Sequence, residues 1–189
     1  GYPVLREAIV KKLKQENHLD YAVSEIVVGT GGKQGVCNAI LALVNPGDEV
    51  IIPAPYWVSY PQMVKLAGGV PVIVSAGIEQ DFKITAEQLE HAITPKTKMI
   101  ILCSPSNPTG SVYSAEELES LAKVVLAHDD LFVLSDEIYE HINYIGGHCS
   151  IASCQGMKDR TILCNGVSKA YAMTGWRLGW IAAAEWIAK

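Results

Sequence analysis

Helical patterns and short apolar runs alternate along this chain. Apolar side chains at helical spacing predict an amphipathic helix over residues 4–17, and a second helix begins near Gly32 and ends at the Pro-Gly break of residues 45–48. Further helices are expected at residues 56–67, 85–92 and 114–128. Apolar runs predict strands at residues 49–53, 70–74, 99–103, 131–135, 161–164 and 180–183.

The predicted strands are apolar throughout instead of alternating with polar residues. Such runs are typical of strands that helices cover on both faces, and the regular change from helix to strand favours parallel pairing. The sequence therefore predicts an α/β fold with three layers, α/β/α, around a mainly parallel mixed sheet. No repeat or linker interrupts the pattern, so we expect one compact domain over residues 1–189.

Composition and charge exclude several classes of protein. The 189 residues are 49% hydrophobic and 19% charged, which is typical of a packed globular protein. A net charge of −5 argues against nucleic acid or a membrane surface as partner, and no apolar run reaches the roughly 20 residues of a membrane span. The five scattered cysteines favour reduced thiols in the cytoplasm, and without a ligand pattern beside them we expect no metal site.

The segments that follow the predicted strands are rich in polar and aromatic residues. Ligands of open α/β sheets bind beyond the carboxyl ends of the strands, so these segments are the candidate site. They are residues 54–57, 104–110, 136–139 and 165–169.

A glycine-rich turn precedes the helix that begins near Gly32. The free amides of Gly31, Gly32 and Lys33, together with the helix dipole, suit a phosphate. The turn is not a nucleotide P-loop, because Val27 and Gln34 stand where that motif needs Gly and Ser or Thr. A plain strand-to-helix turn is the alternative.

Trp57 and Asn107 each have two interpretations. The Trp57 indole follows a strand and is placed to stack on a flat ligand, although a tryptophan is more often part of the core or of an interface. Asn107 is placed to donate its amide to a ligand oxygen, although Asn-Pro-Thr-Gly also reads as a turn.

Asp136 closes a strand that should be buried. A carboxylate there is costly unless it meets a cation or a hydrogen-bond donor, and the alternative is a helix cap for residues from Glu137 onward. If that segment is helical, Tyr139 faces the same side as Asp136.

Lys169 follows an apolar strand in a stretch that is poor in charge. Such surroundings lower the pKa of an ammonium group and make the amine a nucleophile, whereas a solvated surface lysine is the ordinary alternative. Arg177, between Gly175 and Gly179, suits a bidentate contact with phosphate or carboxylate.

One small molecule has a partner for each of these groups. Pyridoxal 5'-phosphate carries a phosphate, a flat ring, a ring nitrogen that pairs with a carboxylate, a phenolate oxygen and an aldehyde that condenses with an amine. The Gly31–Lys33 amides and Arg177 match the phosphate, and Trp57 matches the flat ring. Asp136 matches the ring nitrogen, Asn107 and Tyr139 the phenolate oxygen, and Lys169 the aldehyde.

The motifs also resemble a known family. Asn-Pro-Thr-Gly, Ser-Asp-Glu-Ile-Tyr and Ser-Lys-Ala-Tyr-Ala-Met-Thr-Gly-Trp-Arg-Leu-Gly stand in the order and spacing of class I/II aminotransferases of the aspartate aminotransferase fold, most similar to their bacterial aspartate aminotransferase subgroup. The resemblance runs from Pro3 to Trp180.

The resemblance implies a role for each candidate residue. Lys169 would form the Schiff base with pyridoxal phosphate and move the proton at the substrate α-carbon, while Asp136 would keep the pyridine nitrogen protonated. Tyr139 and Asn107 would bind the ring oxygen and Trp57 would stack on the ring. The phosphate would be held by Arg177 and the amides of Gly32 and Lys33. Many relatives carry a phosphate-binding serine at the position of Gly166, so the remaining phosphate contact falls to the neighbouring Ser168.

The chain departs from the family in its arginines. The family clamps substrate carboxylates with arginine, but this chain has only Arg6, Arg160 and Arg177, and Arg177 is assigned to the phosphate. The resemblance places the α-carboxylate arginine in a C-terminal small domain, and a phosphate-binding tyrosine of a neighbouring subunit just before the position of Gly1. We therefore expect residues 1–189 to be the pyridoxal-phosphate-binding large domain without the N-terminal arm and the small domain, with little or no activity alone.

The expected parent enzyme moves an amino group from an amino acid, aspartate in first place, to a 2-oxo acid, as a cytoplasmic homodimer. The alternatives are an aromatic, alanine or prephenate aminotransferase or a C–S lyase of the same fold, and a truncated module without catalysis.

Overall fold

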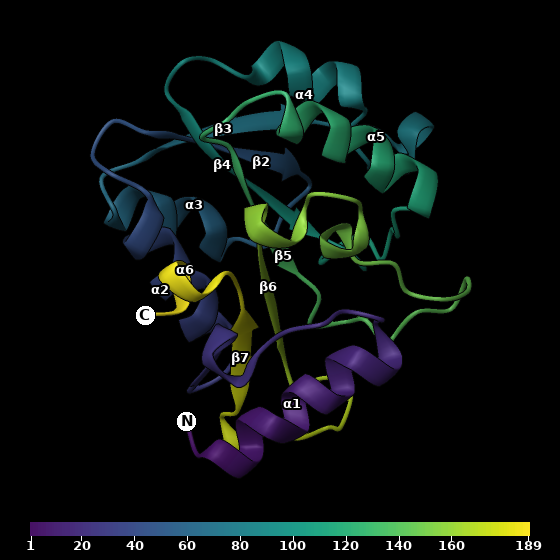
Figure 1. Ribbon diagram of the computed structural model, residues 1–189. Helices are drawn as coiled ribbons and strands as arrows, with labels where there is room; N and C mark the ends of the chain where they lie inside the picture. The colour runs from purple at the N-terminus through teal and green to yellow at the C-terminus, as the bar shows by residue number, and fades with distance from the viewer.

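The computed structural model describes residues 1–189, which form one seven-stranded sheet with helices on both faces (Figure 1). The helices are α1 (Pro3–Glu16), α2 (Gly32–Leu43), α3 (Ser59–Leu66), α4 (Ala86–Ala92), α5 (Ala115–Leu126) and α6 (Glu185–Ala188). The strands are β1 (Ile26–Gly29), β2 (Glu49–Ala54), β3 (Val70–Ser75), β4 (Thr97–Cys103), β5 (Phe132–Asp136), β6 (Thr161–Gly166) and β7 (Gly179–Ala182). Short 3-10 turns lie at Val23–Glu25, Ile78–Gln80, Ile151–Ser153, Lys158–Arg160 and Thr174–Trp176.

The strand order is β1-β7-β6-β5-β4-β2-β3. The strands from β3 to β6 pair in parallel, whereas β7 runs antiparallel to both of its neighbours, β6 and β1. The predicted mainly parallel mixed sheet is therefore confirmed. Because one strand direction dominates, the carboxyl ends of β2, β4, β5 and β6 meet at one edge.

Two helical layers cover the sheet, as predicted. Alternate residues of each strand point to opposite faces, so β5 sends Leu134 toward α2 and α3 but Val133 toward α4 and α5. Helix α1 covers the part of the second face where Leu163 of β6 and Trp180 of β7 lie. Figure 1 shows α2, α3 and α6 together on one side of the sheet, with α1, α4 and α5 on the other.

The structure corrects some of the expected elements. The edge strand β3 is not buried on both faces, since Val70 is 47% and Ile73 is 43% exposed. The pattern missed the four-residue elements β1 and α6. Strand β6 continues to Gly166, because Asn165 and Gly166 pair with β7.

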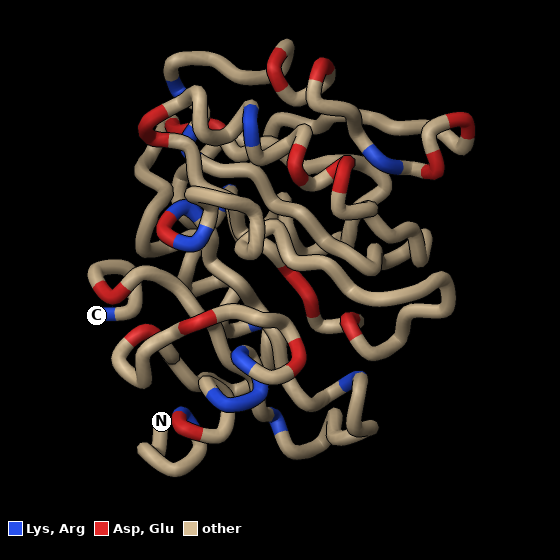
Figure 2. Tube along the Cα trace, turned by 45° about the vertical axis from the view of Figure 1, so that its right-hand side comes forward, with Lys and Arg blue, Asp and Glu red and all other residues tan.

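No helix of the structure combines the length and the apolar character that crossing a membrane requires. Acidic and basic positions are interspersed along the trace (Figure 2). All five cysteines are free thiols.

Candidate functional site

A cavity of about 220 Å³ lies at the sheet edge where the carboxyl ends of the parallel strands meet. Its walls include every residue proposed from the sequence except Gly31, which touches the cavity residue Arg177 instead. The lining residues are Gly32, Lys33, Trp57, Tyr60, Cys103, Asn107, Asp136, Ile138, Tyr139, Ser168, Lys169, Thr174 and Arg177. Side chains from five separate segments thus converge on one small-molecule site.

Asp136 lies at the inner end of this cavity, which we define by Tyr60, Cys103 and Asp136. Its carboxylate is 6% exposed and accepts hydrogen bonds from the Tyr60 hydroxyl at 2.7 Å and from the Ile138 amide at 3.3 Å. Burial holds the pKa of Asp136 above its ordinary value of 3.8, although both hydrogen bonds act to lower it. None of the ion pairs of the structure involves this carboxylate.

The helix-cap interpretation of Asp136 is wrong. No helix begins at Glu137, and the chain enters a turn directly after β5. Tyr139 and Asp136 both line the cavity, as expected, but it is this turn and not a helix that brings Tyr139 there.

Tyr60 is the functional residue that sequence reasoning missed. Burial, and then the charge of Asp136, raises the pKa of its phenol well above the usual value, so Tyr60 remains a donor. The same two causes raise the pKa of the nearby Cys103 thiol from 9.0 to about 12. Tyr60 lies three residues after Trp57, and their rings meet edge to face at 5.4 Å. That spacing at the start of α3 was the available signal.

Lys169 lies on the cavity wall, but its surroundings differ from the expectation. The apolar run before it is buried in β6, yet the chain leaves the sheet after Gly166 and the Lys169 side chain is exposed. Its ammonium lies 5.7 Å from the centre of the Tyr139 ring. Lys169 is therefore accessible, and the desolvated amine predicted from the sequence is not present.

The outer end of the cavity, defined by Lys33, Arg177 and the adjacent Gly31, lies at the start of α2. Gly31 has a φ of +91°, which favours glycine, and a Cβ there would push the Arg177 guanidinium from its place. The Arg177 side chain donates to the Thr174 carbonyl at 3.0 Å and the Thr30 carbonyl at 3.4 Å. The first amides of α2 have no carbonyl one turn earlier to bind, and they remain available to an anion.

Trp57 combines both interpretations made from the sequence. It packs against the core under α2 and is half-buried, and its ring also lines the cavity. The Lys33 ammonium lies 5.1 Å from the centre of this ring. Asn107 is half-buried in the loop after β4, where the Ser106 amide donates to the Ser111 carbonyl at 2.9 Å.

The packing explains why glycine occupies position 166. A Cβ there would lie 2.9 Å from the Leu178 carbonyl oxygen and 3.0 Å from the Gly179 Cα, so a serine would force the backbone to move. Ser168 is buried at the cavity wall instead. Of the three arginines only Arg177 lines the cavity; Arg160 donates to carbonyls before β5 such as that of His128, at 3.3 Å.

Comparison with known proteins agrees with this geometry. The family model for aminotransferase class I and II matches residues 1–189. An aspartate/prephenate aminotransferase of Cereibacter sphaeroides is 54% identical over 184 residues, which cover 96% of this chain and 46% of that protein. A bifunctional aspartate aminotransferase and glutamate/aspartate-prephenate aminotransferase of Petunia hybrida is 56% identical over 183 residues, covering 96% of this chain and 38% of that protein.

Solved structures give the same result. The aspartate aminotransferase of Rhizobium meliloti superposes with a TM-score of 0.97 at 47% identity, covering 100% of this chain and 48% of that one. The aromatic aminotransferase of Pyrococcus horikoshii gives 0.96 at 46% identity, with 100% and 51% covered. The chain belongs to the class I and II aminotransferases, and the predicted resemblance is confirmed. It spans about half the length of the curated relatives that it matches.

Aminotransferases of this family use pyridoxal phosphate, and the residues of the cavity fit it. Asp136 is a buried carboxylate whose only hydrogen-bond donors are neutral, so a protonated ring nitrogen would supply the cation that it lacks. At the opposite end, the first amides of α2 and Arg177, which packs against Gly31, would suit the phosphate. Lys169 supplies an accessible amine between these two ends.

Proposed function

We propose that this chain is the cofactor-binding part of an enzyme that moves an amino group between an amino acid, aspartate in first place, and a 2-oxo acid. The observation that carries the proposal is the convergence of Asp136, Lys169 and Arg177 on one cavity in a chain of this family. The names of the relatives support the choice of aspartate.

Bound pyridoxal phosphate supplies an electron-accepting ring that stabilises the charge left on the α-carbon when an amino acid loses its proton. Asp136, whose carboxylate the hydroxyl of Tyr60 fixes in position, would hold a proton on the ring nitrogen. Trp57 would stack on the ring, and Asn107 and Tyr139 would bind the ring oxygen.

Lys169 moves the reacting proton. Its amine would hold the cofactor by its aldehyde and, once the substrate has freed it, would be the base that accepts the proton from the substrate α-carbon. Arg177, Ser168 and the amides of Gly32 and Lys33 hold the phosphate, so that the ring keeps its place during this exchange.

We further propose that residues 1–189 are the large domain of the enzyme and have little activity alone. Neither Arg6 nor Arg160 lines the cavity, so the arginine clamp for the substrate carboxylates belongs to another part of the enzyme. A homodimer in the cytoplasm is the assembly that we expect, and the free thiols support that compartment.

Reduction with borohydride in the presence of pyridoxal phosphate tests the cofactor assignment. We expect one modified lysine, Lys169, on peptide mapping. Lys169→Ala should abolish the label, and Lys33→Ala, which removes the other lysine of the cavity, should leave it on Lys169. Labelling at Lys33, or no label in a folded sample, contradicts the proposal. Absence of any new visible absorbance would favour a module without catalysis.

Prephenate is a second amino acceptor that the relatives suggest, because several are named for both aspartate and prephenate. Assays of the full-length enzyme with aspartate as donor, and with 2-oxoglutarate or prephenate as acceptor, separate a dual enzyme from a dedicated one. Turnover with an aromatic amino acid or with alanine, but not with aspartate, would contradict the choice of donor. Appreciable turnover by residues 1–189 alone would contradict the division into domains.

A further inference from the structure

Two buried glutamates flank the turn that carries Tyr139 into the cavity. Glu137 is 1% and Glu140 is 7% exposed, and neither lines the cavity. Asp136 faces α3 through its bond to Tyr60, whereas Glu137, the next residue, bonds to the loop that leads to Ser150 on the opposite face of the sheet. Both carboxylates are thus anchored behind the site and not within it.

Glu137 is held by three side chains. Ser135 and Ser150 donate their hydroxyls to one carboxylate oxygen at 2.8 and 2.6 Å, and the ring nitrogen Nε2 of His148 lies 2.8 Å from the other. Ser150 also accepts the amide of Ala152 at the start of a 3-10 turn. The Glu137 side chain therefore ties the end of β5 to residues 148–152.

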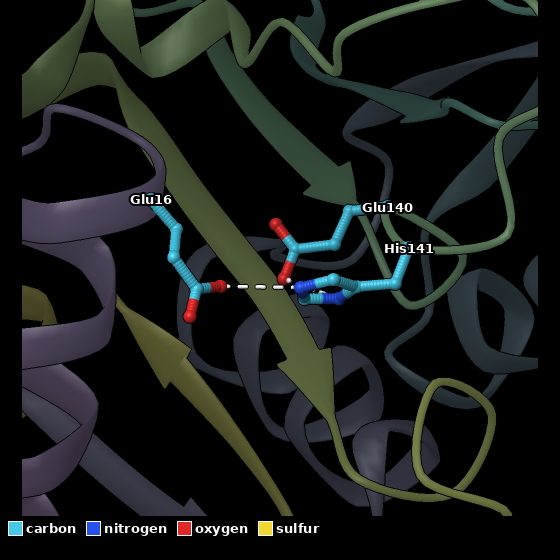
Figure 3. Close-up of side chains that lie close together, drawn as sticks. All are labelled: Glu16, Glu140 and His141. Atoms are coloured by element: carbon cyan, nitrogen blue, oxygen red, sulfur yellow. Dashed lines mark hydrogen bonds and ion pairs between the residues drawn. The ribbon is translucent and has the colours of Figure 1, made fainter.

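Glu140 is held by helix α1. Lys12 forms an ion pair with one of its oxygens, and the Asn17 amide donates to the other at 2.8 Å. His141 lies between Glu140, at 3.3 Å, and Glu16 of α1, at 3.1 Å (Figure 3). Burial acts to raise the pKa of Glu140, but the charge and hydrogen bond of Lys12 and the bond from Asn17 hold it below the usual value. Lys12 already supplies a positive charge here, so we assign no metal to these carboxylates.

Three backbone hydrogen bonds hold this turn: the Glu137 amide donates to the Cys164 carbonyl at 2.9 Å, the Glu140 amide to the Glu137 carbonyl at 3.0 Å and the Ile142 amide to the Tyr139 carbonyl at 2.7 Å. No helix follows that would set the spacing of Asp136 and Tyr139. The side chains of Glu137 and Glu140, which we call the anchors of the turn, hold it at its two ends.

We propose that Glu137 and Glu140 are positioning residues that fix Asp136 and Tyr139 from behind the sheet, so that the groups for the ring nitrogen and the ring oxygen are correctly spaced before the cofactor binds. The proposal rests on the proposed function. It assigns to residues outside the cavity a role in how the bound ring is held, because groups that grip a ligand perform best when their own supports are rigid.

Glu137→Ala in this chain tests the proposal through two measurements on the bound cofactor. The first is the dissociation constant of pyridoxal phosphate, and the second is the pH at which the absorbance of the bound cofactor is half-changed. We expect about tenfold weaker binding and a shift of about 0.5 pH unit, because Asp136 and Tyr139 lose their fixed positions. Glu140→Ala should act in the same direction.

Leu89→Ala is the matched control. Leu89 is the buried residue of α4, away from the turn, so its truncation lowers stability without touching the anchors. The control should keep the wild-type affinity and absorbance midpoint. An equal shift in Leu89→Ala, or wild-type values in Glu137→Ala, would overturn the proposal.

Ser150→Ala decides the question if Glu137→Ala does not fold. It removes one hydroxyl from Glu137 and should weaken cofactor binding about twofold to fivefold, since a net hydrogen bond is worth about 0.5–1 kcal/mol. Wild-type affinity and midpoint in a folded Ser150→Ala would then count against the proposal. If the wild-type chain is not labelled at Lys169, the proposed function itself fails, whereas a labelled wild type with an unchanged variant refutes only the anchors.

Discussion

The inner end of the cavity, around Asp136, is buried and hydrogen-bonded, whereas the outer end, around Lys33 and Arg177, is open to solvent. At the inner end a phenol, a thiol and a carboxylate lie together, and burial raises the pKa of all three. At the outer end two cations are solvated, and the start of α2 presents free amides.

The two ends of the cavity therefore differ in what they cost the free energy of folding. A buried carboxylate without a cation works against the fold until a ligand neutralises it, whereas exposed cations cost the fold little. Changes at the inner end should therefore alter both stability and binding, and removal of a charged side chain at the outer end should alter binding alone. The following variants test that division, from the largest expected effect to the smallest.

Asp136→Ala should have the largest effect on cofactor binding. It removes the only carboxylate of the cavity and leaves the buried Tyr60 hydroxyl without its acceptor. We expect the affinity for pyridoxal phosphate to fall about 100-fold, because hydrogen bonds to a charged group are worth about 1.5–3 kcal/mol. Titration of the chain, followed by cofactor absorbance, measures this loss. An affinity within threefold of the wild type would remove Asp136 from the binding site.

Arg177→Ala should weaken cofactor binding by about tenfold or more, since it removes a charged phosphate donor. The melting temperature without cofactor should not change, because the side chain is exposed and only supports two loop carbonyls. Arg160→Ala is the matched control: it removes bonds to the carbonyls before β5, so it should lower the melting temperature and keep the affinity. A lower melting temperature in Arg177→Ala would break the comparison.

Gly31→Ala tests the one point where backbone geometry shapes the outer end. The backbone at Gly31, with φ +91° and ψ 160°, is in a region that is essentially confined to glycine and costs an alanine about 1–3 kcal/mol, and the new methyl group displaces Arg177. We expect a small loss of stability together with weaker phosphate binding. Gly175→Ala, which meets no atom within 4 Å, should change neither quantity. Equal stability in calorimetry and equal cofactor affinity for the two variants would contradict a role of Gly31 in shaping the phosphate site.

The sequence predicted the groups of the cavity better than their surroundings. Asp136, Lys169 and Arg177 could be found because parallel strands deliver their carboxyl ends to one edge, which local patterns reveal. Tyr60 was missed because its importance comes from a contact 76 residues away along the chain. The exposure of Lys169 depends on where the chain leaves β6, and strand ends are what periodicity places least well.

The anchors of the turn show the same limit. Glu137 contacts Ser150 across 13 residues, and Glu140 contacts Asn17 across 123 residues. Residues 141–150 carry no periodic pattern, so nothing local indicates that Ser150 returns to the end of β5. Such pairs become visible only when the fold brings distant segments together.

The pH dependence of stability should show the smallest effect and test the inner end alone. Because the folded chain holds the Asp136 proton more tightly than the unfolded chain, the wild type loses stability relative to Asp136→Asn as the pH rises above 3.8 and through the raised folded pKa. Below pH 3.8 the carboxyl is protonated in both states, so the difference between the two proteins should level off. Glu140 gives the opposite sign, since its lowered pKa means that stability is lost as the pH falls, and it does so equally in both proteins. Urea unfolding of the cofactor-free proteins from pH 3 to pH 7 measures the difference. A gap that widens toward low pH would mean that the Asp136 carboxylate stabilises the fold without a ligand, and the contrast between the two ends would then fail.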